Sequence, residues 1–434
     1  MNWKEIYQSK LVSVERAAAA VESGDNIWIS AMSDTPMHIL DALSKRYLEL
    51  EDVHLHSGIL MRPFDFLKGE YKGHINYHSI FLGPVDRMFV PQGNVSATSM
   101  HFSNLSWALK NNIKPNVFMV TCTPPDENGY MNFGPVGSLG NDTVLQNAEK
   151  VIIQVNKNMP YIYGERNYMH VSQADFICEA DYDMPVLQNP EVDDVDRKIA
   201  SHIAANINDG DTLQIGIGSL GNAVAYSLEG KKDLGVHSEM LVDSLVYLAK
   251  KGVINCSKKN FNRGKIVFGF AAGSKELHEF VNRNALCEAK PFDYTNNIHN
   301  IAANDNMVSI NSAIAADLTG QICSESIGPK QFSSTGGQLD FVRGATMSKG
   351  GRAFIAIRST ANTKNGIISK ITTSLSKGSV VTTPRSDVQY VVTEYGIVNL
   401  YNKSISERVK LMISIAHPDF RDELTKEAIE TGLI

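Results

Sequence analysis

The sequence predicts an α/β fold made of two similar open domains with mainly parallel sheets, related by an apparent internal duplication. Strand-like apolar segments alternate with helical segments of roughly 10–15 residues, which is the pattern of βαβ units. The second half of the chain then repeats a pattern of the first half. The length of 434 residues fits two or three domains of ordinary size.

The first half opens with alternating helices and strands. An alanine-rich helix comes first, and the later strands are continuous apolar runs, which are typical of strands buried on both faces. The predicted helices are Val14–Glu22 and Met37–Leu48, and the predicted strands are Asn26–Ser30, Val53–His56, Val117–Val120 and Val151–Val155.

The second half continues in the same style after a boundary near residue 190. Two prolines in Met184–Pro190 precede the acidic stretch Glu191–Asp194, and early acids favour a helix start. We therefore predict domains at 1–190 and 191–434. The second domain carries the predicted helices Val195–Ile207 and Asn222–Leu228 and the predicted strands Thr212–Gly216 and Leu234–His237.

The two halves share a local pattern. SGDNIWIS (23–30) lines up with DGDTLQIG (209–216), and the segment that begins at Val53 resembles the one that begins at Gly235. In this alignment Gly58 stands where Glu239 stands, so only the second copy carries a carboxylate. The alternative is that any two βαβ units share a helix, a Gly-Asp pair and a strand.

Composition and charge exclude several classes of protein. The net charge is −6 and no basic run is present, which argues against nucleic acid or an anionic membrane as the main partner. No run approaches the roughly 18 apolar residues of a membrane span, and the N-terminus lacks the features of a signal peptide. The number of cysteines, five, is odd, and no two of them form a CxxC motif. This pattern predicts reduced thiols in the cytoplasm.

No metal site is predicted. His54 and His56 are spaced as half of one, but no third ligand follows at a suitable spacing, so two ordinary strand residues are the favoured interpretation.

The most visible motif is GIGSLG at residues 216–221, which follows a predicted strand and opens a helix. It has the GxGxxG form of a dinucleotide-binding turn, and Glu239 follows where an acid could bind a ribose hydroxyl. Glycines also let backbone N–H groups approach any phosphate or thioester ligand. The bland alternative is a tight packing turn between strand and helix.

Three further segments are candidates for a site. Glu239 lies at the end of a short strand, beside the glycine turn, where open α/β sheets bind ligands. The run Ser333–Ala345 contains adjacent glycines that could bring backbone amides close to a ligand, and Pro124–Gly134 is a long turn-rich loop. The alternative for Glu239 is a solvated glutamate that starts the next helix. The alternative for Ser333–Ala345 is a surface loop, and that for Pro124–Gly134 is a β-turn connection.

Several of these motifs together resemble the acetyl-CoA hydrolase/transferase family, which are class I CoA-transferases. The resemblance is strongest to the 4-hydroxybutyrate and butyrate CoA-transferases. Gly221 stands where the family usually has proline, and Asn297-Ile298 stand where it has His-Pro. The motifs are GIGSLGNAV (216–224), HSEM (237–240), PFDYTN (291–296) and TGGQLDFVRGA (335–345), with MNWKEIY, ENGYMNFG, VTEYGI and IAHPDFRDEL.

The resemblance implies a ping-pong transfer of CoA between a short-chain acyl-CoA and a small carboxylic acid such as acetate. Glu239 is the implied catalytic nucleophile, with a glutamyl-CoA thioester as intermediate. CoA is then a substrate, with no tightly bound cofactor and no metal. A cytoplasmic homodimer is also implied. The implied CoA-contacting residues are Gly216, Ile217, Gly218, Ser219, Leu220, Asn296, Asn311, Gly336, Gly337 and Lys370.

Three other functions stay open at this point. Water could replace the acceptor acid, which would make the protein an acyl-CoA hydrolase. The glycine turn with Glu239 could serve an NAD-dependent oxidoreductase, although no catalytic partner is evident. A non-catalytic CoA-binding protein would require an inert glutamate or a disabled glycine loop.

Overall fold

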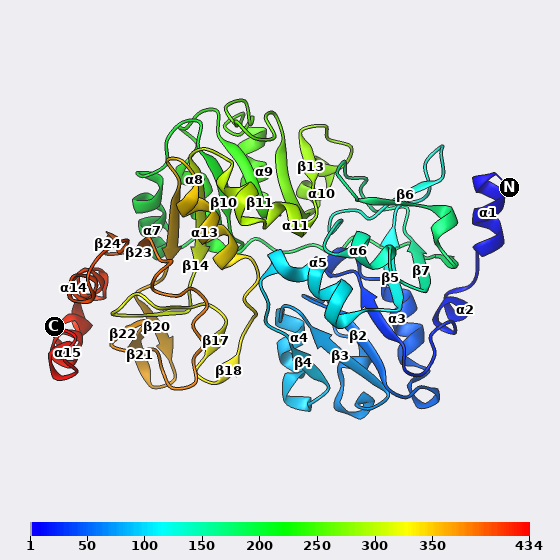
Figure 1. Cartoon of the computed structure of the whole chain (residues 1–434), viewed down its shortest axis with the longest axis horizontal. Coiled ribbons are helices and arrows are strands. Elements are labelled where there is room, and N and C mark those ends of the chain that lie inside the picture. The colour runs from blue at the N-terminus through cyan, green and yellow to red at the C-terminus, as the bar shows by residue number, and fades with distance from the viewer. Residues whose placement is uncertain (1) are drawn as a thin grey trace. The chain divides into compact units, whose positions relative to one another are not determined.

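The computed structural model describes residues 2–434 and divides into two compact units (Figure 1). The first unit contains the chain up to Gln188 together with Val267–Thr295, and the second contains Asn189–Ile266 and Asn296–Ile434. Both units are α/β structures with a large, mainly parallel sheet, as the sequence predicts. The division into domains 1–190 and 191–434 stays a prediction.

The sheet of the first unit has seven parallel strands in the order β4-β3-β2-β1-β5-β7-β9. A separate antiparallel pair, β6 and β8, lies in the same unit. The strands are β1 (Asn26–Ile29), β2 (Val53–Ser57), β3 (Ile75–Ser79), β4 (Val95–Ala97), β5 (Val117–Cys122), β6 (Tyr130–Asn132), β7 (Lys150–Val155), β8 (Tyr168–His170) and β9 (Phe176–Glu179).

In the second unit, neighbouring strands follow the order β11-β10-β14-β19-β23-β24, and only β24 runs antiparallel to its neighbour. The strands are β10 (Thr212–Ile215), β11 (Gly235–Leu241), β14 (Met307–Ser312), β19 (Arg352–Ala356), β23 (Tyr390–Thr393) and β24 (Gly396–Asn399). Smaller strands of this unit are β15 (Ala315–Asp317), β16 (Ile322–Cys323), β17 (Ser326–Ile327), β18 (Lys330–Gln331), β20 (Thr360–Thr363), β21 (Gly366–Ser369) and β22 (Ile371–Thr372).

Helices accompany both sheets. Those of the first unit are α1 (Trp3–Lys10), α2 (Val14–Ala18), α3 (Met37–Ser44), α4 (Pro84–Phe89), α5 (Leu105–Ala108), α6 (Asn141–Leu145), α10 (Lys275–Val281) and α11 (Phe292–Thr295), with most of β12 (Ile266–Ala271) and with β13 (Cys287–Ala289). Those of the second are α7 (Asp194–Ala204), α8 (Ser219–Ser227), α9 (Asp243–Lys250), α12 (Ile298–Ala302), α13 (Gln338–Met347), α14 (Ile405–Ile415) and α15 (Pro418–Glu430).

The predicted strands are confirmed, and the apolar runs explain why. All six residues of β5 and five of the six residues of β7 are buried, as expected for strands covered on both faces. The predicted helices are present with shifted ends. Helix α2 ends at Ala18 rather than Glu22, α3 ends at Ser44 rather than Leu48, and α8 begins at Ser219, directly after Gly218.

The strand register confirms that the two halves repeat one local structure. In the first unit Asn26 pairs with His54, and in the second Thr212 pairs with Gly235, which are the positions that the sequence alignment matches. The order β2-β1-β5-β7-β9 is likewise repeated as β11-β10-β14-β19-β23. The match therefore extends well beyond a generic βαβ unit.

The Gly-Asp pair before each first strand has the same contacts in both copies. Gly24 and Gly210 both have positive φ, of 84° and 82°. The Asp25 carboxylate accepts an N–H from three residues upstream, at 2.9 Å, and that of Asp211 does so at 2.7 Å. Each aspartate also forms an ion pair with the cation that begins the strand two places along the sheet. Asp25 pairs with Lys150 of β7 at 3.4 Å, and Asp211 pairs with Arg352 of β19 at 2.6 Å.

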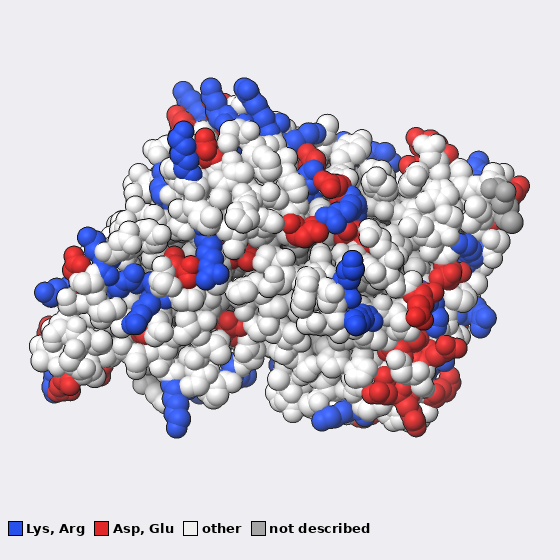
Figure 2. Space-filling view, viewed as in Figure 1, with Lys and Arg blue, Asp and Glu red and all other residues white. Residues whose placement is uncertain are grey.

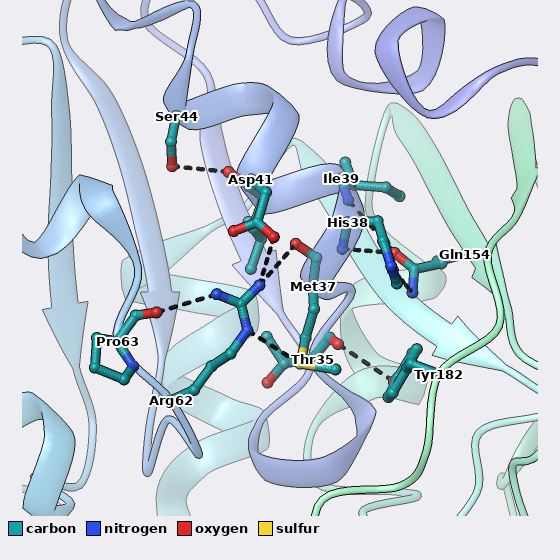
Figure 3. A network of polar contacts seen from close by, with 11 residues as sticks. Thr35, Met37, His38, Ile39, Asp41, Ser44, Arg62, Pro63, Gln154 and Tyr182 are labelled. Carbon is teal, nitrogen blue, oxygen red and sulfur yellow. Dashed lines mark hydrogen bonds and ion pairs between the residues drawn. The ribbon is translucent and has the colours of Figure 1, made fainter.

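A polar network fixes the start of α3 in the first unit (Figure 3). Pro36 at the N-cap has no side chain that can cap the helix, and the Gln154 amide oxygen instead accepts N–H bonds from His38 at 3.1 Å and Ile39 at 3.4 Å. Tyr182 donates a bond to the carbonyl of Ser33 at 3.1 Å. Gln154, far along the chain, thus satisfies N–H groups at this helix end, and Tyr182 fixes the turn that precedes the helix.

The turn-rich segment Pro124–Gly134 is a β-turn connection that leads into β6. The Asp126 carboxylate accepts N–H bonds from Asn128 and Tyr130, both at 2.9 Å. The Trp3 indole donates to the Glu127 carbonyl at 3.0 Å, so α1 packs on this loop. These contacts give the segment a structural role.

The surface carries charges of both signs. On the face drawn in Figure 2, basic side chains gather along the upper left edge and acidic side chains gather at the lower right. Within residues 2–434, no helix combines the length and apolar character that crossing a bilayer requires. The cysteines are buried, and no disulfide joins them in this part of the chain. No three His, Cys, Asp or Glu side chains of the described residues are grouped so that they could hold a metal ion.

His54 and His56 belong to a cluster of three histidine rings on β2 and β3. His54 Nδ1 lies 2.8 Å from His78 Nε2, and the rings of His56 and His78 stack with centroids 4.7 Å apart. Burial, with the neighbouring His78 and His54, lowers the pKa of His56 to about 3. This ring is therefore neutral in the folded protein over most of the pH range.

We predict that this cluster makes stability depend on pH. Folding lowers the pKa of His56 below its unfolded value of about 6.5. The contribution of the neutral His56 ring to the free energy of unfolding is therefore complete above pH 6.5 and is lost as the pH falls toward 3. Between pH 7 and pH 5, His56→Gln should lose roughly 1–2 kcal/mol less unfolding free energy than wild type. Urea titrations at both values measure this difference, and equal losses in wild type and His56→Gln would contradict it. His202→Gln, on α7, is the matched control.

Candidate active site

Glu239 lies near the carboxyl end of β11, on a strand whose preceding residues are all buried. Val236, His237 and Ser238 are fully buried, whereas Glu239 is partly exposed. The Ser238 hydroxyl donates a 2.7 Å bond to the Met240 carbonyl, which fixes the backbone on both sides of the glutamate. The strand thus places one carboxylate at the edge where parallel sheets bind ligands.

Asn296 reaches this carboxylate from the segment before α12. Its side-chain amide donates a 2.7 Å hydrogen bond to Glu239 Oε2, and the residue is fully buried. The neighbouring Asn297 has a separate task, because its side chain caps α12 by accepting N–H bonds from His299 and Asn300. Of the two adjacent asparagines, Asn296 thus contacts Glu239 and Asn297 caps the helix. The contact of Asn296 is present although Asn297-Ile298, and not His-Pro, follow it.

Gly337 approaches the same carboxylate from the amino end of α13. It is the N-cap residue of this helix, and its backbone N–H hydrogen-bonds Glu239. A Cβ at position 337 would lie 1.9 Å from Glu239 Oε2 and 2.3 Å from Asn296 Nδ2. Only glycine lets the backbone come this close.

The environment of Glu239 raises its pKa to about 7. Burial is the main cause, and the nearby Asp340 charge adds to it, whereas the bonds from Asn296 and Gly337 oppose the rise. The carboxyl group is thus close to half-ionised at neutral pH. A carboxylate with little hydration and two fixed donors is suited to act as a nucleophile.

The glycine turn 216–221 follows β10 and leads into α8. Gly218 has φ of 120°, a conformation that favours glycine, and Ile217 is 58 % exposed. A Cβ on Gly221 would lie 2.3 Å from the Gly216 carbonyl oxygen, so this third glycine serves the turn's own packing. The turn does not need a dinucleotide to explain its glycines.

The amino end of α8 differs from that of its counterpart α3. In the first unit Gln154 on β7 caps α3, and the repeated register places Ala356 of β19 at the matching position. Gly218, the N-cap residue of α8, has no side chain to cap the helix, and the hydrogen bonds of residues 2–434 include none from the first N–H groups of α8 to another side chain. Its first N–H groups, together with the positive end of the helix dipole, are thus suited to an anionic or polar ligand.

Two other predicted residues have different partners. Asn311 on β14 exchanges amide hydrogen bonds with Gln214 on β10, at 3.1 and 3.4 Å, directly before the glycine turn. Lys370 lies near Arg358 and Glu394, and burial followed by the Arg358 charge lowers its pKa. The structure thus brings Glu239, Asn296 and Gly337 into contact, with Gly336 adjacent, but not Asn311 or Lys370.

The sequence did not single out Gln214 or Asp340 as site residues. Gln214 faces Asn311 from the repeated segment DGDTLQIG, and Asp340 is a buried residue in the first turn of α13. Asp340 lies within the Gly-rich run that the sequence did identify. The position of each within a motif was visible, but the Asn311 partner of Gln214 and the effect of the Asp340 charge on Glu239 were not.

We predict that Gly337→Ala displaces the Glu239 carboxylate. The added methyl group overlaps Oε2, so the 2.7 Å bond from Asn296 should lengthen beyond 3.5 Å or break. A crystal structure of the variant measures this distance. Gly230→Ala, where a Cβ would meet nothing within 4 Å, should leave it unchanged. An intact bond in Gly337→Ala would contradict the geometry described above.

Comparisons with known proteins identify the family of the chain. Residues 1–188 match the acetyl-CoA hydrolase/transferase N-terminal domain, and residues 273–428 match the C-terminal domain. The chain is 42 % identical to a 4-hydroxybutyrate coenzyme A transferase of Clostridium kluyveri, over 98 % of this chain and 99 % of that one. It is 39 % identical to a butyryl-CoA:acetate CoA-transferase of Anaerostipes caccae, covering 99 % and 98 %.

A solved structure extends the similarity to three dimensions. The crystal structure of RipA from Yersinia pestis superposes with a TM-score of 0.94 at 36 % identity, covering all of both chains. Relatives of this similarity over nearly the full length fix the family and the class of enzyme. The chain belongs to the acetyl-CoA hydrolase/transferase family, and it is an enzyme of the CoA-transferase class.

Proposed function

We propose that the protein transfers CoA from a short-chain acyl-CoA, 4-hydroxybutyryl- or butyryl-CoA, to acetate through a covalent intermediate on Glu239. The observation that carries this proposal is the convergence of the Asn296 amide and the Gly337 N–H on one partly buried carboxylate. The named activities of the two relatives described above support this choice of acyl group and acceptor.

The first half-reaction loads CoA onto the enzyme. An ionised oxygen of Glu239 attacks the thioester carbon and expels CoA thiolate, which leaves an acyl-glutamyl anhydride. The thiolate then attacks the glutamyl carbonyl carbon, and the acyl group departs as a free carboxylate. The enzyme now carries a glutamyl-CoA thioester, and no bond or charge is unaccounted for.

The second half-reaction runs the same steps in reverse with acetate. Acetate attacks the glutamyl thioester and expels thiolate, which attacks the acetyl carbon of the new anhydride. Acetyl-CoA leaves and Glu239 is again a carboxylate. Whenever the Glu239 carbonyl becomes tetrahedral, its oxygen gains negative charge, which the donors of Asn296 and Gly337 are placed to stabilise.

The glycine turn and the glycine pair supply the proposed CoA contacts. The uncapped amino end of α8 supports a role for residues 216–220 in binding the thioester and pantetheine part of CoA. Gly336, Asn311 and Lys370 remain proposed contacts of the same ligand. A homodimer in the cytoplasm also remains a proposal, supported by the family resemblance.

Two alternatives share parts of this site. An acyl-CoA hydrolase would use water in place of acetate, and the family name includes that activity. The NAD-dependent reading needs Glu239 to bind a ribose hydroxyl, whereas Asn296 and Gly337 already engage its carboxylate. CoA release measured with and without acetate separates transferase from hydrolase.

We expect wild-type enzyme mixed with butyryl-CoA alone to gain one CoA on Glu239. Intact-mass measurement followed by peptide mapping detects the adduct. Glu239→Ala should form no adduct and lose transfer to acetate by at least about 10³-fold, because the nucleophile is gone. Glu430→Ala, a glutamate at the end of α15, is the matched control and should behave as wild type. Absence of any adduct on the wild-type protein would refute the covalent route.

The pKa of Glu239 predicts how the rate depends on pH. Since the nucleophile must be ionised and its pKa is raised to about 7, kcat/KM should rise tenfold per unit below pH 7 and level off above it. In Asn296→Ala the lost donor no longer lowers this pKa, so the midpoint should move to higher pH. Asn297→Ala, which loses only a helix cap, should keep the wild-type midpoint; a shift there or none in Asn296→Ala would contradict this assignment.

A further inference from the structure

The loop before α13 must hold Gly337 in place although it forms no strand beyond the single β-bridge residue Gly336. Residues 332–337 belong to no helix or strand, yet the Gly337 N–H must meet the Glu239 carboxylate. Two of its backbone N–H groups, those of Phe332 and Ser333, donate to the Glu325 carbonyl at 2.8 and 3.1 Å. Glu325 is therefore the first anchor of the loop.

The Glu325 side chain is a second anchor. It is buried, at 5 % exposure, between β16 and β17. Its carboxylate accepts bonds from Thr335 Oγ1 at 3.4 Å and from Gln331 Nε2 at 3.3 Å, both on the loop side. It also accepts a 3.0 Å bond from Thr382 Oγ1, which comes from a distant part of the chain.

Thr383, which follows Thr382 in the chain, fixes the segment on the carboxyl side of Gly336 and Gly337. Gln338, directly after Gly337, accepts a 3.2 Å bond from Thr383 Oγ1 and donates a 3.0 Å bond to the Ser312 carbonyl. Thr382 and Thr383 thus hold both flanks, one through Glu325 and Thr335 and the other through Gln338. Only Gly336 and Gly337 lie between the two fixed points.

We propose that Glu325 is a positioning residue, which sets the Gly337 N–H against the Glu239 carboxylate through its bonds to the loop and to Thr382. The proposal rests on the proposed function, because it assigns Glu325 to the same covalent step. Glu325 does not touch the reacting atoms. It acts on them through the backbone of the loop that it anchors.

The chemistry of the anchor requires a carboxylate. Both of its oxygens accept, and they meet three donors from Thr335, Gln331 and Thr382. A glutamine keeps only one acceptor oxygen, so its NH₂ group would face at least one of these donors, and a hydroxyl there would have to turn and accept instead of donate. The contacts that hold the loop would then be rearranged although the residue has almost the same shape.

Removal of the anchor should slow chemistry more than it weakens binding. A donor misplaced by about 1 Å typically lowers a rate by roughly 10²-fold, whereas contacts to the rest of CoA are unaffected. We expect Glu325→Gln and Thr382→Val to lower the single-turnover rate of the CoA adduct on Glu239 by about 10–100-fold. The KM for the acyl-CoA should stay close to the wild-type value, and Thr382→Ser, which keeps the hydroxyl, should restore the rate.

Asp317→Asn is the matched control. Asp317, the last residue of β15, is also buried, at 2 % exposure, and within residues 2–434 its carboxylate accepts bonds from neutral groups of Thr319 and Gln321, which follow it in the chain. It should therefore lose stability as Glu325→Gln does but keep the adduct rate. Thermal unfolding of each variant measures the stability.

The outcomes distinguish a failure of the positioning role of Glu325 from a failure of the proposed covalent function. Adduct formation at the wild-type rate in Glu325→Gln and Thr382→Val overturns the positioning role, as does an equal slowing in Asp317→Asn. If Glu325→Gln does not fold, Thr382→Val, which removes only a hydroxyl, decides the question. If wild type forms no adduct while transfer still occurs, the proposed covalent function fails first and the positioning role fails with it.

Discussion

The site depends on one partly buried carboxylate that keeps its place because hydrogen-bond donors meet it. Glu239 loses much of its hydration near the end of β11, and this burial raises its pKa. Asn296 and the amino end of α13 return part of the lost stabilisation. The balance leaves a group that is ionised often enough to react and poorly enough solvated to be reactive.

The repeated architecture shows how one scaffold carries two different sheet edges. The register of β1 with β2 matches that of β10 with β11, so Gly58 occupies the position of Glu239. Within this repeat, Gln154, which caps α3, and Ala356 hold equivalent positions in their own sheets, and alanine has no group that could cap α8. The second copy thus has both a carboxylate and an uncapped helix, whereas the first has neither.

The fold was largely predictable because its signals are local. Buried strands such as β5 and β7 are continuous apolar runs, and the Gly-Asp pairs mark both first strands. The contacts of the site were less accessible. Residues 239, 296 and 337 lie far apart in sequence, and Asn296 rather than Asn297 was singled out by the family resemblance and not by a local pattern. The pairing of Asn311 with Gln214 was equally hidden in the sequence, because pairing between adjacent strands depends on their register.

The contact at Gly337 also limits how the gene can change. A Cβ there would overlap both Glu239 and Asn296, and every amino acid other than glycine has one. Any nucleotide change that alters this amino acid should therefore displace the Glu239 carboxylate. Substitution at position 337 is thus not a route to a different substrate preference.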